Sequence, residues 1–256
     1  MRELTTIAEL RDAAEDDALP LWAAQGFATG ARAWTHAGAV AVAGPRLSLR
    51  DRLAVRGPAP AAARLVRHAL AEAGPSYRPV GDTDLIASLL AAVPGLALVD
   101  TFGWMEIGGS RLAAPADAHW LRPDELPQAA ALIAEAYPGS YARPEDRSGA
   151  RTVHRSGART AHRWAGVRDG AGRLTAVAAD AWSAPEVGFL AGVAAHPRHG
   201  RGRGHAEAAC RLVLDTLLRR SGRAALMVDG DNPAAIRLYH RLGLHWRDVS
   251  AAAVEG

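Results

Sequence analysis

Short runs of apolar residues separated by polar and turn residues mark the first 114 residues as alternating strands and helices. A capping box at Thr6–Glu9 predicts a first helix that reaches about Asp17. The other predicted elements here are strands at 31–36, 40–43, 53–56, 76–80 and 96–107, and helices at 61–73 and 82–93. This alternation predicts an α/β layer.

The second part of the chain continues the alternation. Its predicted helices begin at Asp124, Gly204 and Pro233, and its predicted strands cover 163–168, 174–182, 187–195, 224–228 and 245–251. The stretch Gly108–Asp117 is interpreted as a linker. We therefore expect two domains, 1–114 and 115–256. The second has a mixed central sheet flanked by helices; the first is a smaller α/β domain, with a degenerate copy of the same fold as one interpretation.

A glycine- and arginine-rich loop lies between the strand 187–195 and the following helix. Residues 193–206 read VAAHPRHGRGRGHA. Glycines let several backbone N–H groups turn toward one point, and the start of a helix adds partial positive charge. With its arginines, the loop suits a pyrophosphate, although a solvated turn is the alternative. The chain has no lysine, so this is no nucleotide P-loop.

A second motif, DGDNPAAIRLYHRLGL, covers residues 229–244. Asp231 or Asn232 is suited to cap a helix that starts at Pro233, and Gly243 is suited to end it. Apolar residues recur at helical spacing along the segment, at Ile236, Leu238, Tyr239 and Leu242. Tyr239 is either a reactive phenol or an aromatic side chain of the core.

Together the two motifs resemble those of the GNAT superfamily of acyl-CoA-dependent N-acyltransferases. Arg201–Ala206 resembles the R/Q-x-x-G-x-G/A loop, and residues 232–243 resemble the pattern N-x-x-A-x-x-L-Y-x-x-L-G. The similarity covers roughly the last half of the chain, and the branch it most resembles is that of the glycine N-acyltransferase-like proteins. One departure is that three residues separate Pro197 from Arg201, where the family usually has two.

The resemblance implies an N-acetyltransferase that uses acetyl-CoA as co-substrate and a primary amine as acceptor. Tyr239 is the expected general acid, because a phenol can protonate the departing thiolate. The strand Val193–Ala195 is expected to stabilise the oxyanion and to pair with the pantetheine arm. The residues expected to bind the coenzyme are Val193, Ala195, Arg201, Gly202, Arg203, Gly204, His205, Ala206 and Asn232.

The general base is open at this stage. Glu186 starts the strand where related proteins often place a carboxylate, but an ordinary surface carboxylate beside Pro185 is the alternative. His196 and His199 have suitable pKa values, yet both lie in the phosphate loop. Water-mediated deprotonation of the amine is a further alternative.

Composition argues against several other classes of protein. All 30 basic residues are arginine, but the formal net charge is only +3 and no clustered basic face predicts nucleic-acid binding. The single Cys210 excludes an internal disulfide, and no metal site is expected. No apolar run is long enough to span a membrane, and the amino-terminal segment does not read as a secretory signal. We expect a cytoplasmic protein; a monomer and a homodimer are both open.

Residues 147–154 and 155–162 form an internal repeat, RSGARTVH and RSGARTAH. Glycines and stacked arginines disfavour a helix there, so a duplicated loop is predicted. An arginine flap over the acceptor is the alternative. Two other functions stay open: a non-catalytic acyl-CoA-binding or regulatory module, and a nucleic-acid-associated factor that uses the repeat.

Overall fold

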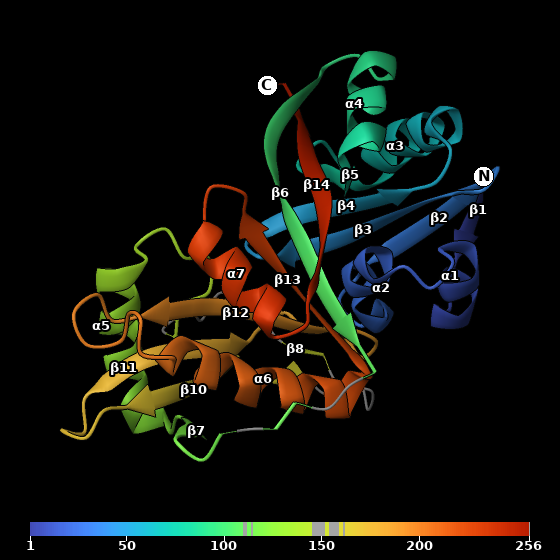
Figure 1. The fold of residues 1–256 in the computed structure, drawn as a ribbon. Coiled ribbons are helices and arrows are strands. Elements are labelled where there is room, and N and C mark those ends of the chain that lie inside the picture. Colours follow the sequence, from blue (N-terminus) through green and yellow to red (C-terminus); the bar gives the residue numbers. More distant parts are fainter. Residues whose placement is uncertain (110–111, 114, 145–151, 154–158, 161, 256) are drawn as a thin grey trace. The chain divides into compact units, whose positions relative to one another are not determined.

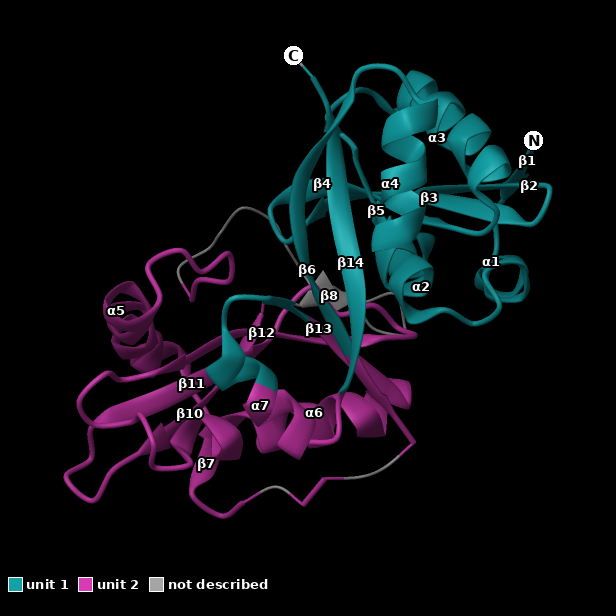
Figure 2. Cartoon of the chain, turned by 45° about the horizontal axis from the view of Figure 1, so that its top comes forward, with its two compact units in different colours: residues 1–105, 227–236, 245–256 teal, residues 106–226, 237–244 magenta. Residues whose placement is uncertain are grey.

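The computed structural model describes residues 1–109, 112–113, 115–144, 152–153, 159–160 and 162–255. The chain forms two compact units, each built from separate stretches of sequence (Figure 2). Unit 1 comprises residues 1–105, 227–236 and 245–256, and unit 2 comprises residues 106–226 and 237–244. The division into domains 1–114 and 115–256 stays a prediction.

The elements of the first half alternate as the sequence predicts (Figure 1). They are β1 (Arg2–Leu4), α1 (Ile7–Ala13), α2 (Ala18–Ala24), the 3-10 turn η1 (Gln25–Phe27), β2 (Arg32–His36), β3 (Ala39–Leu47), β4 (Arg50–Arg56), α3 (Ala59–Ala73), β5 (Arg78–Asp82), α4 (Thr83–Ala92) and β6 (Leu96–Gly108).

In unit 1 the strands lie in the order β1-β2-β3-β4-β5-β14-β6. Strands β1 to β4 are antiparallel neighbours, and β4 pairs parallel with β5. The last strand of the chain, β14 (His245–Val254), pairs antiparallel with β5, matching Val249 to Asp82 and Ala251 to Val80. The carboxy-terminal residues are therefore part of the sheet of the amino-terminal unit.

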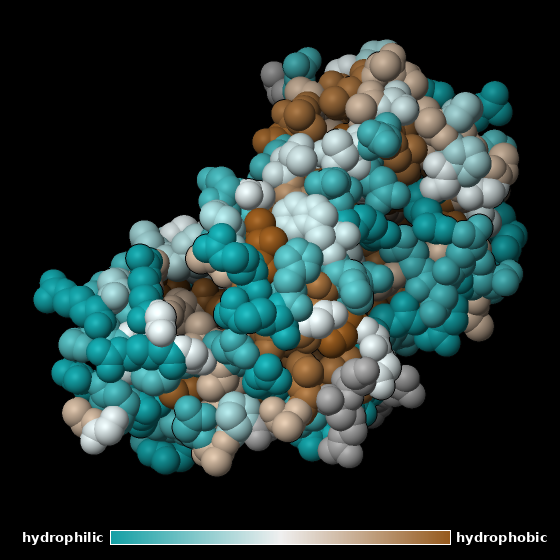
Figure 3. All heavy atoms as spheres, viewed as in Figure 1, coloured by the Kyte–Doolittle hydropathy of each residue, from teal (hydrophilic) through white to brown (hydrophobic). Residues whose placement is uncertain are grey.

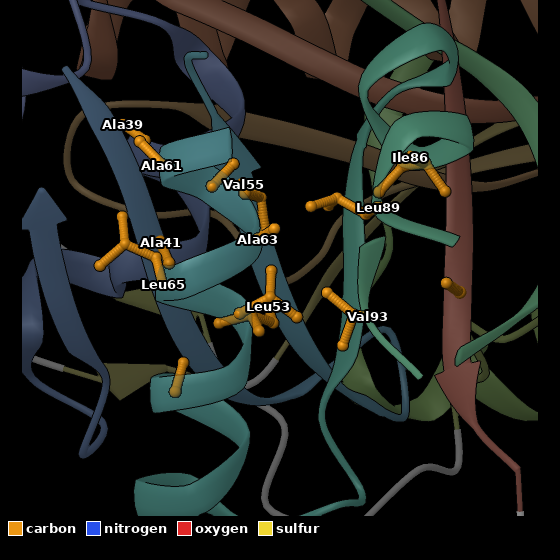
Figure 4. Packing of buried hydrophobic residues seen from close by; sticks show 14 of the residues in the cluster. Ala39, Ala41, Leu53, Val55, Ala61, Ala63, Leu65, Ile86, Leu89 and Val93 are labelled. Atoms are coloured by element: carbon orange, nitrogen blue, oxygen red, sulfur yellow. The ribbon is translucent and has the colours of Figure 1, made fainter. Parts of the chain in front are cut away.

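The core of unit 1 lies between this sheet and the helices α3 and α4. Figure 4 shows side chains of β3, β4, α3 and α4 that point toward one another. Its labelled members are Ala39, Ala41, Leu53, Val55, Ala61, Ala63, Leu65, Ile86, Leu89 and Val93. Ala252 of β14 is fully buried in the same cluster, so β14 contributes packing as well as backbone hydrogen bonds.

The second half of the chain contains β7 (Ala118–Trp120), the 3-10 turn η2 (Pro123–Glu125), α5 (Leu126–Ala136), β8 (Thr152–Val153), β9 (Arg159–Thr160), β10 (Arg163–Arg168), β11 (Leu174–Asp180), β12 (Gly188–Ala195), α6 (His205–Ser221), β13 (Arg223–Asp229) and α7 (Pro233–Arg241), before β14. In unit 2 the strands lie in the order β13-β12-β11-β10-β7. Helix α6 packs against β10, β11 and β12, and α5 packs against β11 and β12.

The predicted fold class, a mixed central sheet flanked by helices, is confirmed. The structure adds β1, β7 and α2, which the sequence pattern did not predict. Helix α2 is buried along its whole length and so has no polar face to reveal its period. Most of the repeat at 147–162 lies outside the described residues; within it, β8 and β9 form an antiparallel pair.

The order of elements occurs twice along the chain. The first half contains β2, β3, β4, α3, β5, α4 and β6; the second contains β10, β11, β12, α6, β13, α7 and β14. In each set the first three strands are antiparallel neighbours, and the third pairs parallel with the fourth. The repeated order and pairing support the interpretation of the first half as a copy of the second.

The carboxylate of Glu125 is expected to make a pH-dependent contribution to the free energy of unfolding. Its buried carboxylate accepts hydrogen bonds from the Arg122 amide at 2.9 Å and from Arg168 Nη2 at 2.7 Å. These bonds lower the pKa of Glu125 to about 2. Since the folded pKa lies below the unfolded value of about 4.3, the stabilisation is present above that value and is lost as pH falls toward 2.

We expect Glu125→Gln to lower the free energy of unfolding at pH 7 by on the order of 1–3 kcal/mol. Denaturant unfolding at pH 7 and at pH 3 should show a smaller difference between wild type and variant at the lower pH. Glu72→Gln is the control, because Glu72 pairs with Arg32 while its side chain is 45% exposed. If Glu125→Gln lowered the free energy of unfolding equally at both pH values, the ionised carboxylate of Glu125 would not be the source of the stabilisation.

Candidate active site

A β-bulge interrupts β12 at Gly192 and Val193. Ala191 is opposite Ala179 and Ala194 is opposite Val177, so these two residues oppose Ala178 alone. Gly192 has φ +58°, and a Cβ atom there would lie 2.5 Å from the ring of the buried Trp164. Only glycine fits this backbone. Because a bulge redirects backbone groups out of the regular ladder, this segment is suited to bind a ligand through its main chain.

The loop after β12 is held against β11. The amide of His196 donates to the carbonyl of Thr175 at 2.8 Å. The amides of Gly200 and Arg201 both donate to the carbonyl of His196, at 2.9 and 3.2 Å, which closes a wide turn. A Cβ atom on Gly200 would lie 2.1 Å from the Thr175 carbonyl oxygen. The three residues between Pro197 and Arg201 are therefore accommodated in a turn that only glycine at position 200 permits.

The end of this loop offers unpaired backbone donors. Gly202 and Gly204 have φ values of +71° and +76°, and an added Cβ atom would meet nothing within 4 Å at either position. The glycines are thus required by backbone conformation and not by crowding. In the part of the chain that the structure describes, the amides of Gly202, Gly204, His205 and Ala206 have no hydrogen-bond acceptor. Alternating left-handed glycines at a helix start form a concave anion site.

Arginine side chains surround these donors. Arg198, Arg201 and Arg203 are exposed, and none lies within ion-pair distance of a carboxylate among the described residues. Three uncompensated guanidinium groups next to open amides favour a multiply charged anion. The predicted coenzyme-binding residues from Arg201 to Ala206 thus lie in one continuous segment that combines open amides with exposed arginines.

His205 fixes the start of α6. Its Nδ1 lies 2.7 Å from the hydroxyl of Thr175, which itself donates to the carbonyl of Val167 at 3.0 Å. Since the hydroxyl proton is used in that bond, Nδ1 of His205 donates to Thr175. Thr175 is fully buried, so the pair joins the helix start to the middle of the sheet. Sequence reasoning missed Thr175; its only signal is a polar residue within an apolar strand.

Helix α7 carries Tyr239 and is capped at both ends. Asn232, not Asp231, is the amino-terminal cap, because its Oδ1 accepts from the amide of Ala235 at 3.1 Å. At the other end, Gly243 has φ +88° and its amide donates to His240, while the Leu244 amide donates to the carbonyl of Tyr239. These two bonds are a Schellman motif.

Ion pairs join the end of α7 to the first turn of α6. The guanidinium of Arg241 donates to Oε2 of Glu207 from Nε at 3.3 Å and from Nη2 at 3.2 Å. Burial opposes ionisation of Glu207, but hydrogen bonds from Arg211 and Arg241 outweigh it and lower its pKa. The carboxylate therefore stays charged and holds the helix of Tyr239, whose side chain is 6% exposed, beside the start of α6.

Two further residues with reactive side chains, Glu186 and Cys210, lie outside the segment that carries the open amides of the loop. Glu186 lies in the turn before β12, at the opposite end of that strand from the loop at 196–204. At ~3.3 Å per residue, roughly 20 Å of strand separates it from the bulge. Cys210 is fully buried, and burial raises the pKa of its thiol, so it is unsuited to act as a nucleophile.

The described residues contain no cluster of three or more His, Cys, Asp or Glu side chains arranged to hold a metal ion. Among the helices described, none combines the length and apolar character needed to cross a membrane.

The chain is similar to known proteins in both sequence and fold. Residues 126–244 match the model of the acetyltransferase (GNAT) family. A solved GCN5-related N-acetyltransferase from Kribbella flavida is 20% identical, with a TM-score of 0.58 over 99% of this chain and 97% of that one.

Two further solved structures share the fold. An acetyltransferase of the GNAT family from Colwellia psychrerythraea is 13% identical, with a TM-score of 0.53 over 98% of both chains. A GCN5-related N-acetyltransferase from Sphaerobacter thermophilus is 18% identical, with a TM-score of 0.50 over 85% of this chain and 81% of that one. No curated protein matches the sequence. Residues 126–244 are thus similar in sequence to GNAT acetyltransferases, and the chain has the mixed α/β fold of GNAT proteins.

Proposed function

We propose that this protein transfers the acetyl group of acetyl-CoA to a primary amine by direct attack. The observation that carries the proposal is a set of open amides at a helix start, next to arginines without ion pairs among the described residues. These amides belong to Gly202, Gly204, His205 and Ala206. A pyrophosphate matches such a site in charge and in its number of acceptor oxygens. The match of residues 126–244 to the GNAT acetyltransferase family supports an acyl-CoA as the ligand.

In this proposal the acetyl-pantetheine arm lies along β12. Val193 and Ala195 pair with its amides as a neighbouring strand would. A backbone N–H turned outward at the bulge holds the carbonyl oxygen of the thioester as negative charge develops on it. Asn232 is the further predicted contact of the coenzyme, in addition to its role as a helix cap.

The chemical step balances without a covalent enzyme intermediate. The neutral amine nitrogen attacks the thioester carbon, a C–N bond forms, and the C–S bond breaks when the oxyanion collapses. Tyr239 gives its phenolic proton to the departing thiolate. The ammonium loses one proton to water, and the phenolate regains one. Glu186 stays the predicted carboxylate near the amine, but its separation along β12 favours water for the proton transfer itself.

We propose that only the second half of the chain binds the coenzyme. In the first half, β4 is joined to α3 by two residues, Gly57 and Pro58. Pro58 caps α3 and Pro60 follows in its first turn, so two backbone donors are missing where α6 has open amides. This difference supports a first half that kept the fold and lost the site, and it predicts one coenzyme per chain.

Release of free coenzyme A thiol tests the reaction. Acetyl-CoA and the protein are combined with a panel of primary amines, and a thiol-reactive chromophore reports turnover. The background is low because Cys210 is fully buried. We expect thiol release that depends on one or more amines. Coenzyme binding without release for any amine would instead support the non-catalytic acyl-CoA-binding module.

The similarity to the glycine N-acyltransferase-like branch and the cytoplasmic location stay predictions.

A further inference from the structure

A second group of basic side chains borders the phosphate loop. The turn Asp169–Arg173 joins β10 to β11, and β11 begins at Leu174. Thr175, two residues after Arg173, accepts the hydrogen bond from His196 and lies directly against Gly200. The backbone therefore brings the end of this turn next to the loop tip that carries His199.

The turn holds Arg173 in a fixed position. The amide of Asp169 donates to the Arg173 carbonyl at 3.0 Å, and Oδ1 of Asp169 accepts from the amides of Ala171 and Arg173, each at 3.0 Å. Oδ2 accepts from Nε of Arg173 at 2.8 Å and lies 2.8 Å from its Nη2. The Nη1 group of Arg173 has no acceptor among the described residues, and its side chain is 56% exposed.

His199 lies among these cations. Its ring is 4.6 Å from the ring of His196, centroid to centroid. Desolvation, followed by the charges of Arg173, His196 and Arg203, lowers the pKa of His199, and only Asp169 acts in the opposite direction. Two arginines, Arg173 and Arg203, thus act on His199 against the single carboxylate of Asp169, and this balance favours an incoming anion. A second carboxylate oxygen, Oε2 of Glu135, lies 3.7 Å from Nε2 of His196.

We propose that Arg173, His199 and Arg203 bind the 3′-phosphate of coenzyme A. This inference rests on the proposed function, which places the pyrophosphate at Gly202–Ala206. The 3′-phosphate is a separate anion one ribose away from the pyrophosphate, so it needs a second basic group beside the first. Hydrophilic residues dominate this end of unit 2, at the left of Figure 3, as a site for a charged nucleotide requires. The extra loop residue gives this chain the turn that presents His199.

Dephospho-coenzyme A, which lacks only the 3′-phosphate, tests the inference. Titration calorimetry gives the Kd of each ligand for the wild type, Arg173→Ala and His199→Ala. The wild type should bind coenzyme A at least ~10-fold more tightly than the dephospho form. Each variant should weaken coenzyme A binding about 5- to 10-fold while leaving the Kd of the dephospho form within about 2-fold.

Arg11→Ala is the matched control, since Arg11 pairs with Asp16 and is 48% exposed. It should change neither Kd. Melting curves of the free proteins show whether each variant folds; Arg173→Ala keeps the backbone bonds that Asp169 makes in the turn.

The outcomes separate the two claims. Equal wild-type affinity for the two ligands, or a preference for coenzyme A that survives in both variants, would overturn the 3′-phosphate site and leave the proposed function standing. If the wild type binds neither ligand, the proposed function itself fails.

Discussion

A chain that ends at Leu244 is expected to lose the folded amino-terminal unit. The deleted strand β14 pairs with β5 between Val249 and Ala251, and its residues 249–252 are at most 2% exposed. Arg247 also makes two hydrogen bonds to Asp17, at 2.6 and 3.2 Å. Loss of the ladder, the buried side chains and the ion pair removes on the order of 5 kcal/mol or more, which approaches the whole stability of a typical domain.

Thermal unfolding and limited proteolysis of the 1–244 chain test this expectation. We expect rapid cleavage within residues 1–105 and no cooperative melting of that unit. Arg247→Ala in the full-length chain is the matched control; it breaks the pair with Asp17 but keeps the strand, so it should destabilise without unfolding. A 1–244 chain that melts within a few degrees of the full-length protein would refute the role of β14.

Tyr239→Phe is expected to lower kcat about 100-fold and to leave the Kd of acetyl-CoA within about 2-fold. The change removes the proton donor for the thiolate, while the ring of phenylalanine fills the same volume. Since Tyr239 is only 6% exposed, the melting temperature of the variant must be measured alongside.

Tyr77→Phe serves as the control for loss of a tyrosine hydroxyl, because Tyr77 is a partly buried residue packed at the core cluster of unit 1. It should leave kcat unchanged. If Tyr239→Phe retains wild-type turnover in the same assay, Tyr239 is not the general acid.

Local patterns in the sequence were sufficient for most of the elements. The strand predicted at 163–168 has the bounds of β10, and the capping box of Thr6 and Glu9 is present as expected. Periodicity and caps are local signals, so they can be recognised in the sequence without knowledge of the fold. The partner of β14 was not predictable, because pairing with β5 joins segments about 170 residues apart and leaves no mark in either one.

In the candidate site, too, local features could be predicted from the sequence and contacts between distant segments could not. The glycines of the loop and the cap at Asn232 could be predicted from motif spacing, since each has a local conformational reason. The hydrogen bond between Thr175 and His205, which fixes the start of α6, could not be predicted, because it joins a strand to a helix that lies about 30 residues further along the chain. Gly192 offered a signal that was not used: an isolated glycine within a predicted strand is typical of a bulge.

Titration calorimetry of the intact protein with coenzyme A tests the central claim most directly. The comparison is with Gly200→Val, whose side chain would collide with the Thr175 carbonyl and distort the loop. Gly108→Ala is the control, because a Cβ atom there would meet only the Gly222 carbonyl oxygen, at 3.9 Å, and its φ is not in the left-handed range. We predict one coenzyme per chain, an unchanged Kd for Gly108→Ala, and binding at least ~100-fold weaker for Gly200→Val. Absence of binding to the wild type, or equal binding by Gly200→Val, would contradict the assignment of this loop as the coenzyme site.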